Sequence, residues 1–172
     1  MKTGIIKDII LFLLLISLQV FLLDRINIFG VATPILYIYF LIKMTLGSNR
    51  FYVIISGFFL GLIIDIFMNT PGMNAAATTI VAAFREPIIK LIYTRDAYDE
   101  LTPSMNTDSK SFIRLSISLV LLHQILLFLI ESFTLFNIEL TLLRIVSSSI
   151  LTLLIIFAVD ALFGKKSVVS EF

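Results

Sequence analysis

The residue best suited to chemistry is Asp65, a carboxylic acid within a long apolar stretch. It is preceded by Gly57 and Gly61 and followed by Asn69, all at steps of four residues. On a helix this spacing forms one stripe, where the glycines let a second helix approach closely and the polar side chains offer it hydrogen bonds. At membrane depth, such an acid predicts either a polar latch between helices or a binding or coupling site that uses its charge.

The residues after Asp65 supply a sharp turn and then a helix of small side chains. The turn is Asn69-Thr70-Pro71-Gly72, and residues 73–83 are rich in alanine and threonine. Proline followed by glycine is typical of a tight turn. We therefore expect the helices before and after the turn to pack together, with Asn74, Thr78 and Thr79 available to hydrogen bond Asp65. A ligand cavity lined by the same groups stays open as an alternative.

The single histidine, His123, lies in the middle of another apolar stretch, beside Gln124. A proton relay through it would need further acids on neighbouring spans at a similar depth. The sequence places no such acids there. We therefore expect a hydrogen bond between helices at His123.

The sequence lacks the residues that several kinds of catalysis and ligand binding require. There is no cysteine, no Gly-x-Ser-Gly, no phosphate-binding loop ending in Gly-Lys-Ser/Thr and no His-Glu-x-x-His. The acids are not paired in the motifs of intramembrane aspartyl proteases. A net charge of +1 offers no basic cluster for nucleic acid. The sequence therefore predicts a protein that is not an enzyme, with no catalytic residues, no cofactor and no metal site.

The elements that carry these residues are predicted to be membrane-spanning helices. Hydrophobic residues make up 59% of the 172 residues, only 15% are charged, and the mean hydropathy is +1.06, whereas soluble domains are about a quarter charged. We expect an all-α, polytopic membrane protein of a single domain, in contact with membrane lipids. Its six predicted spans are residues 5–23, 31–46, 51–68, 73–92, 112–130 and 140–163, and residues 93–111 form a solvated loop.

The distribution of lysine and arginine predicts the orientation. With six spans, eleven of these residues fall on one side and only Arg25 and Arg144 on the other. Positive residues near helix ends stay cytoplasmic. Both termini and the loop at 93–111 are therefore expected in the cytoplasm. The fourth span is the weakest, because Arg85, Glu86 and Pro87 interrupt it, and if it only re-enters the membrane the later spans invert.

One part of the sequence resembles a known family. The pattern Gly61-Leu62-x2-Asp65, with Gly72 and a helix of small residues after it, resembles the rod shape-determining protein MreD family. The resemblance implies a non-catalytic component of the bacterial inner membrane that binds the bitopic protein MreC in the machinery of cell elongation and peptidoglycan synthesis. It also implies indirect association with MreB filaments, a SEDS glycosyltransferase and a class B penicillin-binding transpeptidase.

The same resemblance leaves a second function open. The family is similar in fold to the substrate-binding S components of ECF vitamin transporters, which bind a small molecule in an outer cavity. Such a cavity needs converging polar and aromatic groups. The chain has no tryptophan, and its expected outer loops are short, so the sequence favours the scaffold.

Overall fold

The computed structural model describes residues 2–23, 25–26, 32–93, 101–132 and 138–163. This part of the chain is helical apart from its connections. Its elements are α1 (Lys2–Leu18), the π-helix η1 (Gln19–Leu23), the 3-10 helix η2 (Leu36–Ile38), α2 (Tyr39–Lys43), α3 (Arg50–Met68), α4 (Met73–Ile92), α5 (Ser109–Glu131) and α6 (Ile138–Phe163).

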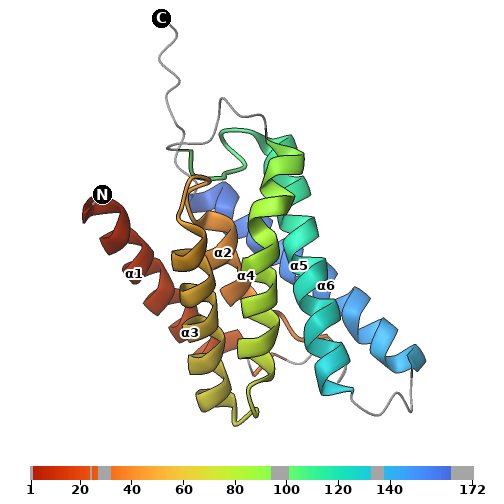
Figure 1. Ribbon diagram of the computed structural model, residues 1–172. Helices are drawn as coiled ribbons and strands as arrows, with labels where there is room; N and C mark the ends of the chain where they lie inside the picture. The colour runs from red at the N-terminus through yellow and green to blue at the C-terminus, as the bar shows by residue number, and fades with distance from the viewer. Residues whose placement is uncertain (1, 24, 27–31, 94–100, 133–137, 164–172) are drawn as a thin grey trace, which may run out of the picture.

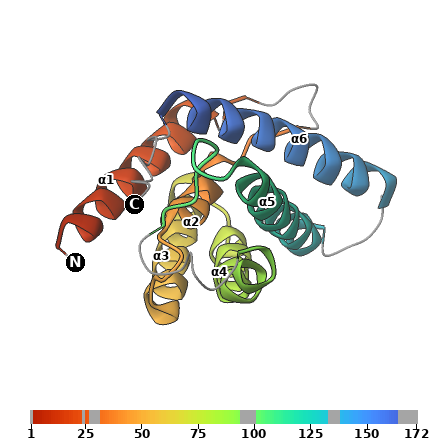
Figure 2. The same cartoon turned by 90° about the horizontal axis from the view of Figure 1, so that it is seen from above.

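The long helices surround the short helix α2. Seen from above, α1, α3, α4, α5 and α6 follow one another around it (Figure 2), and each consecutive pair in this series is in contact. Asn49 begins α3 by accepting a hydrogen bond from the Phe51 amide, and Asp108 does the same for the Ser111 amide at the start of α5. The helix ends are thus defined by capping side chains.

Within the described residues, four helices are long and apolar enough to cross a membrane, at Ile5–Leu23, Arg50–Met68, Ser109–Glu131 and Ile138–Phe163. Large apolar side chains on these helices point outward, among them Phe51, Leu129 and Leu154. Water would not stabilise so much exposed apolar surface, whereas lipid would. The coarse prediction of an all-helical membrane protein is therefore supported.

The prediction of a spanning helix at 31–46 was wrong. Ala32–Ile35 is not helical, and η2 and α2 together cover only Leu36–Lys43. Eight helical residues extend about 12 Å, well short of the roughly 30 Å hydrocarbon core. Pro34 lacks an amide hydrogen and disfavours a helix through this point. We call residues 32–43 the broken segment.

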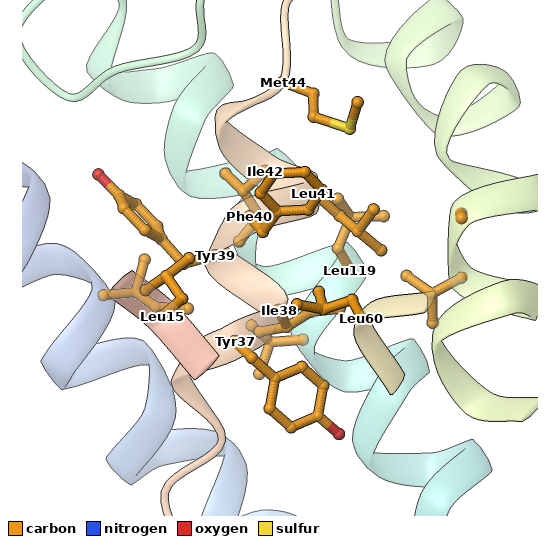
Figure 3. Packing of buried hydrophobic residues seen from close by; sticks show 14 of the residues in the cluster. Leu15, Tyr37, Ile38, Tyr39, Phe40, Leu41, Ile42, Met44, Leu60 and Leu119 are labelled. Atoms are coloured by element: carbon orange, nitrogen blue, oxygen red, sulfur yellow. The ribbon is translucent and has the colours of Figure 1, made fainter. Parts of the chain in front are cut away.

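The broken segment nevertheless runs from the end of the bundle where α1 finishes to the end where α3 begins (Figure 1). Residues 34–42 are all buried. Irregular backbone at membrane depth is tolerated where protein encloses it. Figure 3 shows the side chains of the segment packed against Leu15, Leu60 and Leu119 of the surrounding helices.

The expected span at 73–92 is present as a helix with these bounds, α4. It carries Arg85, Glu86 and Lys90, and it is not among the four helices that are apolar enough to cross a membrane by themselves. Six spans therefore stay a prediction. The end of α2 and the starts of α3 and α5 lie toward one end of the bundle, and the turn at 69–72 lies at the other (Figure 1).

Candidate functional site

Asp65, near the end of α3, binds the first turn of α4. Its Oδ1 accepts from the Asn74 amide at 3.0 Å and from Asn74 Nδ2 at 2.9 Å, and its Oδ2 accepts from the Ala75 amide at 2.8 Å. The Thr70 hydroxyl also donates to Oδ1. The first amides of a helix have no partner within that helix, and a negative charge there is favourable. Asp65 is 4% exposed. Its carboxylate therefore caps the N-terminal end of α4.

The two glycines of the stripe lie where α3 and α4 approach each other most closely. A Cβ atom at Gly61 would lie 2.5 Å from the Asn74 carbonyl oxygen and 2.6 Å from the Ala75 Cα atom. At Gly57 it would lie 2.9 Å from the Ala82 Cβ atom. Only glycine permits this backbone approach at Gly61, and the expected tight packing of the two helices follows from it.

The other residues of the predicted stripe and turn have different places. Asn69 does not continue the stripe, because α3 ends at Met68 and Asn69 adopts the left-handed conformation as its C-cap, with φ of 53°. Gly72, with φ of 77°, is the N-cap residue that precedes α4. Asn69, Pro71 and Gly72 are all exposed. They therefore shape the turn, and the turn residue whose side chain bonds the Asp65 carboxylate is Thr70.

A chain of hydrogen bonds joins Asp65 to His123. Asn74 binds Asp65, the Tyr37 hydroxyl donates to Asn74 Oδ1 at 2.7 Å, and the same hydroxyl lies 3.2 Å from His123 Nε2. All four residues are buried. The expected hydrogen bond between helices at His123 is present, and its partner is the broken segment. We call Asp65, Asn74, Tyr37 and His123 the Asp65–His123 chain.

The start of the broken segment is held by side chains from η1 and α6. Gln19 of η1 bridges it, because Nε2 donates to the Pro34 carbonyl at 3.0 Å and Oε1 accepts from the Leu36 amide at 2.8 Å. On α6, Ser148 Oγ accepts from the Thr33 amide at 3.1 Å and Thr152 Oγ1 from the Ile35 amide at 3.0 Å. These bonds replace the ladder that a continuous helix would provide.

The other end of the broken segment is held by ionic groups. Arg85 of α4 donates to the carbonyls of Leu41 and Met44, at the end of α2. Lys43 forms a salt bridge of 2.8 Å with Asp160 of α6, to which the Tyr39 hydroxyl also donates at 2.7 Å. Arg85 and Asp160 are buried, and their charges have the partners that ionic groups in a protein interior require.

Asp160 also binds part of the segment that was predicted as a solvated loop. Its Oδ2 accepts from the Ser104 hydroxyl at 3.0 Å and from the Met105 amide at 2.6 Å. Ser104 is buried, and α5 begins at Ser109, three residues before the predicted span. Residues 101–108 are thus packed onto the bundle, whereas residues 94–100 of the predicted loop lie outside the described part.

Asp108, at the start of α5 and outside the spans, is the exposed capping residue of this segment. Hydrogen bonding from Ser111, both through its side chain and through its amide, lowers the pKa of the Asp108 carboxyl below its usual value. A hydrogen bond to a carboxylate favours its charged form. The charge at this helix end is therefore stabilised.

Sequence reasoning anticipated an ion pair of Asp160 with a lysine at the level of Lys43, but it missed the contacts that Tyr37, Gln19 and Arg85 make with or within the broken segment. Each of these three residues is a polar residue within an apolar stretch. This pattern could have identified them as residues that bond to another part of the chain. Polar groups in such stretches need partners. Their identity could not be read from spacing, because Arg85 and its acceptor Leu41 are 44 residues apart.

The arrangement offers hydrogen bonds and helix caps, and its one histidine contacts a hydroxyl whose proton is already donated to Asn74. In the described part of the chain, no three side chains of His, Cys, Asp or Glu are grouped to hold a metal ion. Comparison with protein-family models, with curated proteins and with solved structures found no match. A function must therefore be inferred from the residues and contacts of this chain.

Proposed function

We propose that the chain is a non-catalytic scaffold of the bacterial inner membrane that takes part in cell elongation by binding an MreC-like bitopic protein. Through this partner it associates with MreB filaments, a SEDS glycosyltransferase and a class B penicillin-binding transpeptidase. The observation that carries the proposal is the pattern Gly61-Leu62-x2-Asp65 with Gly72, which resembles the MreD family.

The contacts of this pattern support a structural role. Both oxygens of Asp65 accept hydrogen bonds from α4, and Gly61 touches the α4 backbone. A residue whose bonding capacity is used to join two helices supplies rigidity. A scaffold needs a fixed shape to present its surface to a partner.

The filled centre of the bundle supports a scaffold over an S component. A vitamin-binding protein needs a cavity that encloses its ligand. Here α2 occupies the centre, and the side chains of Tyr37, Phe40, Leu41 and Ile42 are 0–2% exposed (Figure 3). These side chains pack against the core cluster of the surrounding helices.

The proposal includes the topology. Five long helices and the broken segment provide six crossings, with both termini in the cytoplasm, because eleven of the thirteen lysines and arginines then lie on that side. The broken segment crosses inside the bundle, while the helices around it face lipid.

Affinity purification from membranes tests the function. The full chain, carrying an affinity tag, is extracted in mild detergent from a rod-shaped bacterium depleted of its own MreD, and bound proteins are identified by mass spectrometry. An unrelated tagged polytopic protein of similar size gives the background. We expect enrichment of the MreC-like protein and recovery of rod-shaped growth.

The alternative function, an S component of a vitamin transporter, predicts a different set of co-purified proteins. Enrichment of ATP-binding transport subunits, with no recovery of cell shape, would overturn the scaffold and favour the S component. Failure of both enrichments, at normal membrane abundance, would also reject the scaffold.

A further inference from the structure

The donor and the acceptor of each hydrogen bond in the Asp65–His123 chain can be assigned by starting at the Asp65 carboxylate. The two carboxylate oxygens of Asp65 accept hydrogen bonds from the Asn74 and Ala75 amides, which can only donate. Asn74 Nδ2 faces two acceptors, Asp65 Oδ1 at 2.9 Å and Thr70 Oγ1 at 3.1 Å. These contacts fix the orientation of the Asn74 amide, with its NH2 group toward Asp65.

The orientation of Asn74 determines the role of the Tyr37 hydroxyl. Asn74 Oδ1 can only accept, so the hydroxyl at 2.7 Å must donate its one proton to this oxygen. The hydroxyl oxygen is then left as an acceptor. His123 Nε2, at 3.2 Å from it, must therefore carry a proton and donate.

This assignment leaves the other ring nitrogen of His123 as an acceptor. The residue is fully buried, and a charged imidazolium without a counter-ion would be costly there, so the ring is neutral. A neutral ring with hydrogen on Nε2 has a lone pair on Nδ1. Nδ1 is buried and has no hydrogen-bond partner within the described chain.

Nearby side chains do not supply the missing donor. The amide nitrogen of Gln124, the next residue, is directed to Thr152 Oγ1 at 3.3 Å. The buried hydroxyls of Ser116 on α5 and Ser149 on α6 also have no hydrogen-bond partner within the described chain, so neither donates to Nδ1. Buried polar atoms without a protein partner are commonly satisfied by internal water.

We propose that His123 Nδ1 is the acceptor of a buried water-binding site and that the Asp65 carboxylate, acting through Asn74 and Tyr37, sets the tautomer that creates it. The water donates one hydrogen to Nδ1. The site is independent of the proposed scaffold function, since it depends only on contacts inside the bundle.

The single histidine makes the proposal directly measurable. The full chain is prepared with nitrogen-15 histidine labelled at Nδ1 in one sample and at Nε2 in another, reconstituted into lipid bilayers, and studied by solid-state NMR. We expect a protonated Nε2, an unprotonated Nδ1, and polarisation transfer from water to Nδ1. An imidazolium, a protonated Nδ1, or an unprotonated Nδ1 without water transfer would each overturn the proposal.

Two matched variants test the origin of the tautomer. Tyr37→Phe removes the acceptor of Nε2, and we expect a mixture of tautomers in place of one. Tyr39→Phe removes a hydroxyl of the same short segment that donates to Asp160 instead, and we expect the wild-type spectrum. An unchanged single tautomer in folded Tyr37→Phe would show that Asp65 does not set it.

Discussion

The guanidinium of Arg85 lies at the end of α2, with Nε 2.6 Å from the Leu41 carbonyl oxygen. A second nitrogen of the same group donates to the Met44 carbonyl. These are the last carbonyls of a short helix, which have no partners within it and carry partial negative charge. An arginine on α4 thus terminates a helix from a distant part of the chain.

Arg85→Met should therefore destabilise the protein. It leaves buried carbonyls without donors, at a cost of about 1–3 kcal/mol for each unsatisfied group. The measurement is the thermal unfolding midpoint in detergent, with Arg114→Met, at an exposed position on α5, as the control. Equal midpoints for the two variants would mean that the guanidinium does not support α2.

Gly61→Leu should separate α3 from α4. The added side chain meets the α4 backbone, and overpacking of this kind costs about 1–3 kcal/mol or more. We expect lower membrane abundance and, under the proposed scaffold function, loss of rod-shaped growth. Ala76→Leu adds a side chain at an exposed position of α4 and should be tolerated. If Gly61→Leu matched Ala76→Leu in both assays, close packing at Gly61 would not be required.

The Asp65→Asn variant tests whether Asp65 acts only as a helix cap or also through its negative charge. Asparagine retains one acceptor oxygen, so one of the two α4 amides loses its partner and stability falls by about 1–3 kcal/mol. We expect a lower unfolding midpoint but normal rod-shaped growth at normal abundance. Loss of growth shape at unchanged abundance would indicate that the charge itself is used for binding or coupling.

The topology can be tested with fusions of alkaline phosphatase and of green fluorescent protein after residue 99 and after the C-terminus. We expect fluorescence and no phosphatase activity at both positions, because the positive residues are concentrated on that side. Phosphatase activity at either position would contradict six crossings with cytoplasmic termini.

Stability should depend on the charge of Asp108. Because the pKa of Asp108 is lowered in the folded protein, its contribution is present above the unfolded value, about 3.9, and is lost as pH falls through the folded value. Asp108→Asn keeps a capping side chain without the charge. The stability difference between wild type and variant, measured by unfolding in detergent, should be present at neutral pH and vanish in acid. A difference that persists unchanged in acid would exclude the charge as its cause.

The sequence was most informative where local chemistry decides structure. The bounds of α4 were predicted because Pro71 and Gly72 end one helix and loss of hydropathy ends the next. The contact of Asp65 with Asn74 followed from stripe spacing and a short turn. The expected bonds from Thr78 and Thr79 were wrong, because both hydroxyls donate to backbone carbonyls of α4. The broken segment could not be predicted in the same way. Its apolar composition fits a span, but its backbone partners Ser148 and Thr152 lie more than a hundred residues away.

Those distant partners impose an order on biogenesis. Thr33 and Ile35 bond to residues 115 and 117 positions later in the chain, so these amides have no lasting partner until α6 has been synthesised and inserted. Because unpaired amides are costly in lipid, we expect the broken segment to reach its enclosed position only after α6 is present. A nascent chain that stops before α6 lacks Ser148 and Thr152, the acceptors of these two amides.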